Sequence, residues 1–167
     1  MKDILILYYT KNDSTKKMAR AIARGVESVE NVSSIIRTVD SEHIDEHDDL
    51  IVTKDDLKKC KGMIVGSPTH FGNMAAPLKA FFDNTTEEWF NGTLENKLGG
   101  VFTSTSSMHG GQETTLLSMM LPLIHHGMII AGVPYSEKNL SSTTSGGTPY
   151  GPTHVSHNQV IDLTEEE

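Results

Sequence analysis

Short apolar runs alternate along the chain with stretches in which apolar residues recur every three or four positions. The first run, residues 4–9, is almost continuously apolar, which predicts a strand buried on both faces of a sheet. Residues 18–26 carry apolar side chains at helical spacing, which predicts a helix that begins near Ser14 or Thr15. The hydroxyl-rich residues 10–15 join the two. This part of the chain therefore predicts the first half of a β-α-β unit.

The same alternation continues to residue 130. Further strands are predicted over residues 32–39, 63–67, 98–105 and 128–130, and further helices over residues 54–59, 75–83 and 112–126. Residues 85–96 and 141–153 are expected to be connections without regular structure. Five strands that alternate with helices predict an α/β fold with a doubly wound parallel sheet. No repeat or linker interrupts the pattern, so residues 1–167 are expected to form one domain.

The stretch from Met63 to Met74 combines a buried strand with a polar loop. Pro68 cannot donate to a strand ladder and is expected to end the strand, and Gly72 with Asn73 predicts a tight turn. The loop offers one hydroxyl, one imidazole, one aromatic face and one amide, from Thr69, His70, Phe71 and Asn73. This set fits a flat, polar-edged ring better than a phosphate. The alternative interpretation is an ordinary turn.

Three loops follow strands that are predicted to be parallel, at Thr10, Pro68 and Ser104. The carboxyl ends of parallel strands meet at one edge of a sheet, where open α/β folds bind ligands. We therefore expect the three loops to converge on one site. For the hydroxyls of residues 10–15, ordinary helix capping is the alternative.

Composition narrows the classes of partner. The net charge of −8 argues against nucleic-acid binding, which normally needs a basic face. It leaves an anionic cofactor open, because backbone N–H groups and hydroxyls at a helix N-terminus hold phosphates. No apolar run approaches the roughly 18 residues of a membrane span, and no signal peptide is seen at the N-terminus. We therefore expect a cytoplasmic protein.

Cysteine and histidine give little support for a metal site. The lone Cys60 excludes an internal disulfide and a multi-cysteine centre, and is expected to be a bystander thiol. His43 and His47 are spaced to face together on a helix, with acidic residues nearby. A solvated acidic loop is the favoured interpretation of that segment. No metal is expected.

The end of the chain carries a helix start signal. Thr164 resembles an N-cap and Glu167 stands three residues later, as in a capping box. The helix that this signal announces is expected on one face of the sheet and is missing from the sequence. We therefore expect the chain to be cut short.

Several segments in this order resemble the WrbA-type quinone reductases, which have a flavodoxin-like fold. The resemblance covers almost the whole chain and rests on residues 5–9 with 18–21, 66–74, 104–105 with 110–114, 125–128 and 146–151. It implies a sheet of order 2-1-3-4-5 and FMN as cofactor. It also implies a homo-oligomer, a dimer of dimers, in which neighbouring subunits complete the pockets.

Site residues follow from the resemblance position by position. The 5′-phosphate would be held by Thr10, Lys11, Asn12, Asp13, Ser14 and Thr15. The flavin ring would be bordered by Pro68, Thr69, His70, Phe71, Gly72 and Asn73. Its other edge would be covered by Ser104, Thr105, Ser106, Ser107, Met108, His109 and Gly110.

Three further side chains are implied in catalysis, namely His125, Trp89 and His70. His125 matches a flavin-site histidine, and Trp89 matches an aromatic that covers the ring where quinone or nicotinamide stacks. The alternatives are a histidine that stabilises a helix C-terminus and a tryptophan that anchors a loop or a subunit interface.

The sequence departs from the family pattern at four positions. Asp13 stands where the family usually has glycine, and Asn12 replaces an aromatic that is associated with nicotinamide stacking. His70 stands where arginine is common, and His109 lies in a loop one residue longer than usual.

The resemblance implies an enzyme that reduces quinones by two electrons with NAD(P)H, in ping-pong fashion through bound FMN. Two alternatives stay open. The first is an electron carrier that docks a basic protein partner, which the acidic composition would allow. The second is a non-catalytic scaffold that has lost its cofactor, which Asp13 and the missing tail would allow.

Overall fold

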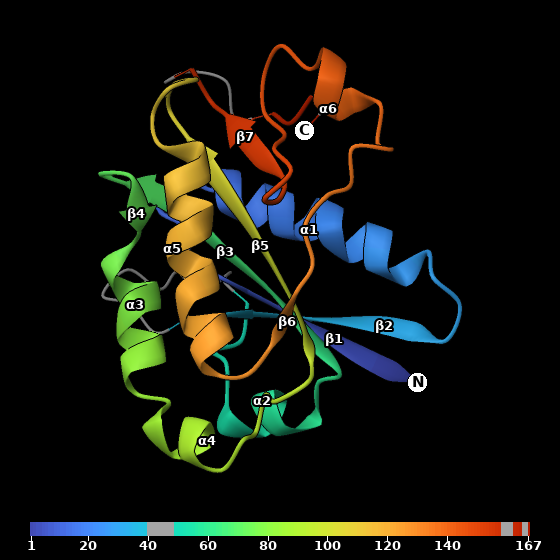
Figure 1. Ribbon diagram of the computed structural model, residues 1–167, viewed down its shortest axis with the longest axis vertical. Helices are drawn as coiled ribbons and strands as arrows, with labels where there is room; N and C mark the ends of the chain where they lie inside the picture. Colours follow the sequence, from blue (N-terminus) through green and yellow to red (C-terminus); the bar gives the residue numbers. More distant parts are fainter. Residues whose placement is uncertain (40–48, 158–161, 165–166) are drawn as a thin grey trace.

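The computed structural model describes residues 1–39, 49–157, 162–164 and 167, and in this part of the chain helices cover both faces of one twisted sheet (Figure 1). The strands are β1 Lys2–Tyr8, β2 Val32–Thr38, β3 Gly62–His70, β4 Asn73–Met74, β5 Leu98–Thr105, β6 Ile129–Ile130 and β7 Thr153–Val155. The helices are α1 Ser14–Glu27, α2 Lys54–Lys59, α3 Ala76–Asp83, α4 Thr86–Phe90, α5 Gln112–His125 and α6 Asn139–Ser142.

The main strands lie in the order β2-β1-β3-β5-β6, and each pairs with its neighbour in parallel. Counted without the short β4, this is the predicted order 2-1-3-4-5, so the doubly wound α/β fold is confirmed. The outer neighbour of β5 comes in two pieces. β6 pairs with Leu98 and Gly99, whereas β7 pairs with residues 103–105. Residues 131–152 loop out between the two pieces, which brings β7 to the carboxyl edge of the sheet (Figure 1).

Alternating side chains of β1 enter two separate cores, which explains why its apolar run is almost continuous. Leu5 and Leu7 pack with α3 and α5 on one face. Ile6 and Tyr8 pack with α1 on the other face, together with Phe102 of β5. The Phe102 ring lies so close to Gly66 that a Cβ atom there would come within 2.1 Å of it. Gly66 is therefore required by close packing between β3 and β5.

Pro68 does not end its strand, contrary to the expectation from sequence. β3 continues through Pro68 to His70, and Pro68 is opposite Ser104 of β5. The carbonyl of Gly66 accepts from Tyr9 N–H on the β1 side, so the nitrogen of Pro68, two residues on, faces the same side. β1 has ended there, and its last pairs are Tyr8 with Gly66 of β3 and Thr38 of β2. The proline therefore removes no ladder hydrogen bond.

Short elements were missed where the sequence predicts connections. α4 lies within residues 85–96, and β7 follows a stretch that was expected to be irregular. Elements of three to five residues carry too few periods to be recognised, so tertiary contacts decide them. Near the chain end, Thr164 N–H donates to the Glu167 carboxylate over 3.0 Å. This contact is one half of the capping box that these two residues predict.

Candidate functional site

The loop between β1 and α1 presents unsatisfied donors at a helix N-terminus. Asp13 is the N-cap of the 14-residue α1, has φ 63° and makes no side-chain capping bond. The Oγ1 atoms of Thr10 and Thr15 are buried and have no hydrogen-bond partner. Buried polar atoms normally have a partner, so these two hydroxyls favour a ligand that supplies acceptors. The N-terminus of α1 adds its partial positive charge, and the loop therefore fits a phosphate.

The second loop is a two-residue hairpin between β3 and β4. His70 pairs with Asn73, and the two residues between them, Phe71 and Gly72, have φ 53° and 75°. Positive φ at both central positions is what a type I′ turn requires. The Phe71 side chain is fully exposed, which is unusual for a bulky residue in this backbone region. The hairpin thus holds an aromatic ring at the rim of the site.

The third loop joins β5 to α5 and is held by its own polar groups. The Thr105 hydroxyl donates to the Ser107 carbonyl over 2.6 Å, and the buried Gln112 amide donates to the Met108 carbonyl over 2.8 Å. Ser106, Ser107 and His109 are exposed, whereas Ser104 and Thr105 are buried. The third loop therefore exposes polar side chains, while its hydrogen bonds and buried residues fix its conformation.

Hydrogen bonds and close packing tie the second loop to the third. Thr115 of α5 donates to the Thr69 hydroxyl over 3.0 Å, and that hydroxyl also lies 3.2 Å from the Thr103 hydroxyl. A Cβ atom at Gly111 would lie 2.8 Å from the Gly72 Cα. Because β1, β3 and β5 are adjacent and parallel, the loops at Thr10, Pro68 and Ser104 share one edge of the sheet, as predicted. Such an edge binds ligands in α/β folds.

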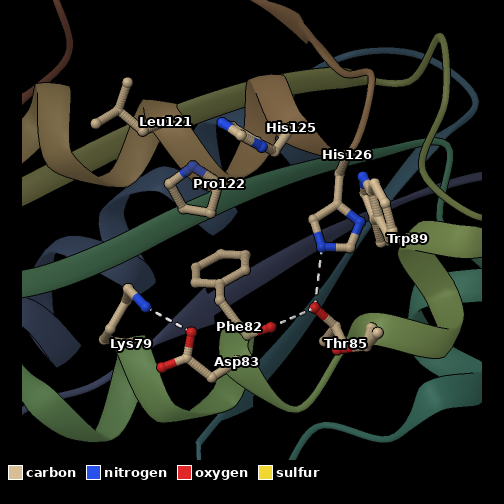
Figure 2. A pocket seen from close by; sticks show the side chains of 10 residues that line it. Lys79, Phe82, Asp83, Thr85, Trp89, Leu121, Pro122, His125 and His126 are labelled. Atoms are coloured by element: carbon tan, nitrogen blue, oxygen red, sulfur yellow. Dashed lines mark hydrogen bonds and ion pairs between the residues drawn. The ribbon is translucent and has the colours of Figure 1, made fainter.

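His125 and Trp89 lie at the other edge of the sheet. α5 begins after the carboxyl end of β5 and ends before β6, so its last residue, His125, is far from the three loops (Figure 1). His125 and Trp89 line one pocket of about 380 Å³ between α3, α4 and the end of α5 (Figure 2). The structure therefore brings these two residues together, but it does not bring them to the loops of the same chain.

His126 also lines this pocket, and the sequence interpretation gave it no role. It is 6% exposed, and its Nε2 lies 2.9 Å from the Thr85 hydroxyl, which donates to the Phe82 carbonyl. Since that hydroxyl proton is used, Nε2 carries the imidazole proton and Nδ1 is a buried acceptor without a partner. Burial lowers the pKa of His126, so the ring is neutral near pH 7. Figure 2 shows Trp89 beside this imidazole.

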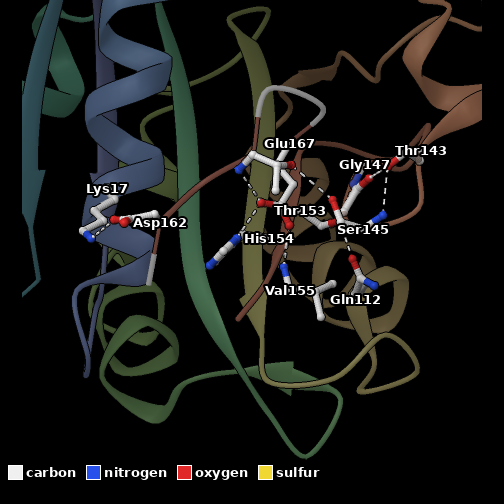
Figure 3. Close-up of polar contacts among 12 residues, drawn as sticks. Lys17, Gln112, Thr143, Ser145, Gly147, Thr153, His154, Val155, Asp162 and Glu167 are labelled. Carbon is white, nitrogen blue, oxygen red and sulfur yellow. Dashed lines mark hydrogen bonds and ion pairs between the residues drawn. The ribbon is translucent and has the colours of Figure 1, made fainter. Parts of the chain in front are cut away.

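A second missed histidine lies at the carboxyl edge. His154 of β7 is completely buried, and its Nδ1 lies 2.7 Å from the Glu167 carboxylate (Figure 3). The residue is opposite Ser104 in the sheet register. The only sequence signal was a histidine between Thr153 and Val155 near the end of the chain, which does not reveal that β7 adjoins the candidate site.

The other candidates from sequence gain no functional role. The His43 and His47 pair lies outside the described residues. Within the part of the chain that the structure describes, no group of three or more His, Cys, Asp and Glu side chains is arranged to hold a metal ion. No described helix has both the length and the apolarity to cross a bilayer. Cys60 is buried, and burial raises the pKa of its thiol.

Solved structures define the class of protein. The WrbA-like flavodoxin from Agrobacterium tumefaciens is 25% identical, with a TM-score of 0.65 over 77% of this chain and 76% of that one. A flavodoxin from the domain Archaea is also 25% identical, with a TM-score of 0.58 over 77% of each chain. The fold is flavodoxin-like, which confirms the resemblance that the sequence motifs carry.

The family follows from two sequence comparisons. Residues 3–138 match the family model of the NADPH-dependent FMN reductases. A curated NAD(P)H dehydrogenase (quinone) from Chromohalobacter salexigens is 42% identical over 168 aligned residues, which cover 93% of this chain and 84% of that protein. The chain therefore belongs to the NADPH-dependent FMN reductase family. It is an FMN-dependent oxidoreductase, and its partnerless hydroxyls at α1 fit the phosphate of that cofactor.

Proposed function

We propose that this protein reduces quinones by two electrons with NAD(P)H, and that both substrates use one flavin face in turn. The observation that carries the proposal is the pair of buried, partnerless hydroxyls of Thr10 and Thr15 at the N-terminus of α1. They lie at the edge where the hairpin and the third loop meet. The quinone is supported by the name of the relative at 42% identity. The acidic composition and the absence of a spanning helix in the described residues fit a cytoplasmic enzyme.

In this proposal the loops bind and orient the cofactor. Residues 10–15 hold its phosphate, residues 68–73 border the ring, and residues 104–110 cover the other edge. FMN supplies two-electron transfer when bound: a hydride leaves the nicotinamide, and the quinone gains two electrons and two protons to become a hydroquinone. The exposed Phe71 ring and the fixed third loop would exclude water from the reacting face.

His125, Trp89 and His70 are proposed as the residues next to the substrates. His70 lies at the hairpin of its own chain, whereas His125 and Trp89 lie at the opposite edge of the sheet. His125 and Trp89 could reach only a flavin that is bound to a second copy of the chain. We therefore propose a homo-oligomer, a dimer of dimers. The exposed side chains of Leu117, Leu121 and Ile124 on α5 support such an interface.

Titration of the protein with FMN, followed by flavin fluorescence, tests the cofactor site. We expect saturable quenching near one FMN per chain. Thr15→Val keeps the shape of the side chain and removes the hydroxyl, so it should weaken FMN binding about tenfold, the size of one hydrogen bond to a charged group. Riboflavin, which lacks the phosphate, should bind the two proteins equally. A protein that does not quench FMN fluorescence at any concentration would overturn the proposal.

Steady-state kinetics test the reaction. NADPH or NADH oxidation with benzoquinone should give parallel double-reciprocal lines, since the two substrates would alternate at one site. Bound FMN without quinone turnover, together with a stable one-electron-reduced flavin, would favour the electron carrier instead. A chain that binds no FMN would favour the scaffold.

A further inference from the structure

His154 lies at the carboxyl edge of the sheet, and its side chain is on the face that α1 covers. It lies on β7 between Thr153 and Val155, opposite Ser104 at the carboxyl end of β5. The Thr153 hydroxyl donates to the Gln112 side chain of α5, so His154, the next residue, faces the opposite side of the sheet. That side is covered by α1, whose N-terminus is at the same edge.

Glu167 determines which imidazole nitrogen carries a proton. Its carboxylate accepts from Val155 N–H over 2.8 Å, from Thr164 N–H over 3.0 Å and lies 2.7 Å from His154 Nδ1. Burial favours a higher pKa for Glu167, but these hydrogen bonds outweigh it and lower the pKa, so the carboxylate is ionised. An ionised carboxylate only accepts, and Nδ1 of His154 therefore carries a proton.

The other nitrogen of this imidazole has no partner. The His154 side chain is completely buried, and its Nε2 makes no hydrogen bond. Figure 3 shows Nε2 turned away from Glu167 and toward the side on which Lys17 of α1 lies. Of the four partnerless buried side-chain atoms in the described residues, three belong to Thr10, Thr15 and His154. All three come from elements that meet at the carboxyl edge on the α1 face of the sheet.

We propose that His154 is a further ligand of the FMN phosphate, with Glu167 as the positioning residue that holds its imidazole. This inference rests on the proposed cofactor site, and it assigns a residue outside the three loops. Phosphate oxygens accept hydrogen bonds, so Nε2 must carry a proton when the phosphate is bound. The imidazole is then a cation between two anions, Glu167 and the phosphate, and it takes its second proton from solvent.

The charges around His154 favour this arrangement. On the chain-end segment, Glu167 faces the imidazole directly, and Asp162 is already paired with Lys17 of α1 over 2.7 Å. On the phosphate loop, Lys11 and Asp13 offset one another in formal charge. β5 presents Ser104, which is uncharged. Residues 11 and 13 of the phosphate loop therefore carry no net charge, and a protonated His154 would supply a positive charge to the phosphate site.

Binding of FMN and of riboflavin to His154→Gln and Glu167→Gln tests the proposal, with flavin fluorescence as the readout. His154→Gln should weaken FMN about tenfold and leave riboflavin within about twofold, because the phosphate contact is the only contact with the flavin cofactor that is lost. Glu167→Gln keeps an acceptor and removes the charge, so FMN should weaken by a smaller factor.

The controls separate this inference from the proposed function. His157→Gln changes an exposed histidine three residues away and should bind both flavins as the wild type does. Equal losses of FMN and riboflavin in His154→Gln would mean a purely structural role and would overturn the inference. So would FMN affinities that are the same in all variants. A wild type that binds no FMN would instead overturn the proposed cofactor site.

Discussion

At the scale of the residue, the backbone at Asp13 explains why glycine is usual there in the family that this chain resembles. Asp13 adopts φ 63°, a left-handed conformation that glycine reaches without strain and that aspartate tolerates better than most residues. The conformation of the loop is therefore kept, but a carboxylate is placed beside the proposed phosphate site. Compared with glycine, Asp13 therefore changes the charge of the loop more than its backbone conformation.

Asp13→Gly should consequently strengthen FMN binding, by roughly three- to tenfold, because a like charge is removed from the anion site. The fluorescence titration described above measures this change. Asp13→Asn serves as the matched control, since asparagine also tolerates positive φ and carries no charge. If glycine improves affinity and asparagine does not, the backbone and not the charge limits binding.

Phe71 shows strain at a candidate functional position. A bulky residue with φ 53° costs about 1 kcal/mol relative to asparagine, and its side chain gains no burial in return. Phe71→Asn creates the Asn-Gly pair that type I′ turns prefer, so the free energy of unfolding should rise by about 1 kcal/mol in urea titrations. FMN affinity should fall in the same variant.

The control for this prediction keeps the ring. Phe71→Tyr should match the wild type in both stability and FMN affinity, because the aromatic face is retained. A Phe71→Asn protein that binds FMN as tightly as the wild type would show that this aromatic ring does not cover the flavin.

At the scale of the element, an ion pair fixes α4, which the sequence did not predict. Lys54 at the start of α2 lies 3.0 Å from the Glu88 carboxylate of α4, and the Glu88 side chain is 1% exposed. Burial works to raise the pKa of Glu88, but the hydrogen bond from Lys54, a backbone hydrogen bond and the charges of Lys54 and Lys58 together outweigh it and lower the pKa. The folded state therefore prefers ionised Glu88, and the pair stabilises it.

This pair predicts a pH dependence of stability. A lowered carboxyl pKa contributes stability above the ordinary pKa of glutamate, and that contribution is lost as the pH falls through the folded value. Urea unfolding of the wild type should therefore weaken from about pH 5 downward, and Glu88→Gln should be less stable at pH 7 and lose less on acidification. Glu87→Gln, which changes the exposed neighbour on the same lysine, should follow the wild type.

At the scale of the whole molecule, the candidate residues form two groups at opposite edges of one sheet. The three loops meet at the carboxyl edge, while Trp89 and His125 share a pocket at the other edge (Figures 1 and 2). No rearrangement of side chains brings the groups together within one chain, because α5 spans the distance between them. Their joint use requires a second copy.

Leu121→Glu tests whether a second copy is used. Leu121 lies on the exposed face of α5 and lines the pocket with His125, so a charge there should dissociate the proposed oligomer. Light scattering should show a smaller assembly, and quinone turnover should fall while FMN affinity is unchanged. Val29→Glu charges an exposed apolar residue elsewhere and should alter neither. Full turnover by a dissociated Leu121→Glu protein would exclude a catalytic role for the neighbouring copy.

The sequence by itself determined the five main strands, the helices α1, α2, α3 and α5, and the three loops. Buried strands and amphipathic helices carry their periodicity within a dozen residues, so the run at residues 4–9 and the helical spacing at 18–26 were sufficient to predict β1 and α1. Because these strands are parallel, their carboxyl ends then placed the loops at Thr10, Pro68 and Ser104 on one edge.

The tertiary structure alone decided what depends on neighbours distant in the chain. Pro68 stays in β3 because β1 has ended beside it, and Lys54 joins α2 to the buried Glu88 of α4. β7 supplies half of an edge strand, which buries His154 next to Ser104 and pairs it with Glu167. The contacts Lys54–Glu88, Ser104–His154 and His154–Glu167 join positions 34, 50 and 13 residues apart and leave no periodic trace in the sequence. Local patterns therefore predicted the framework, and long-range packing selected the side chains that complete it.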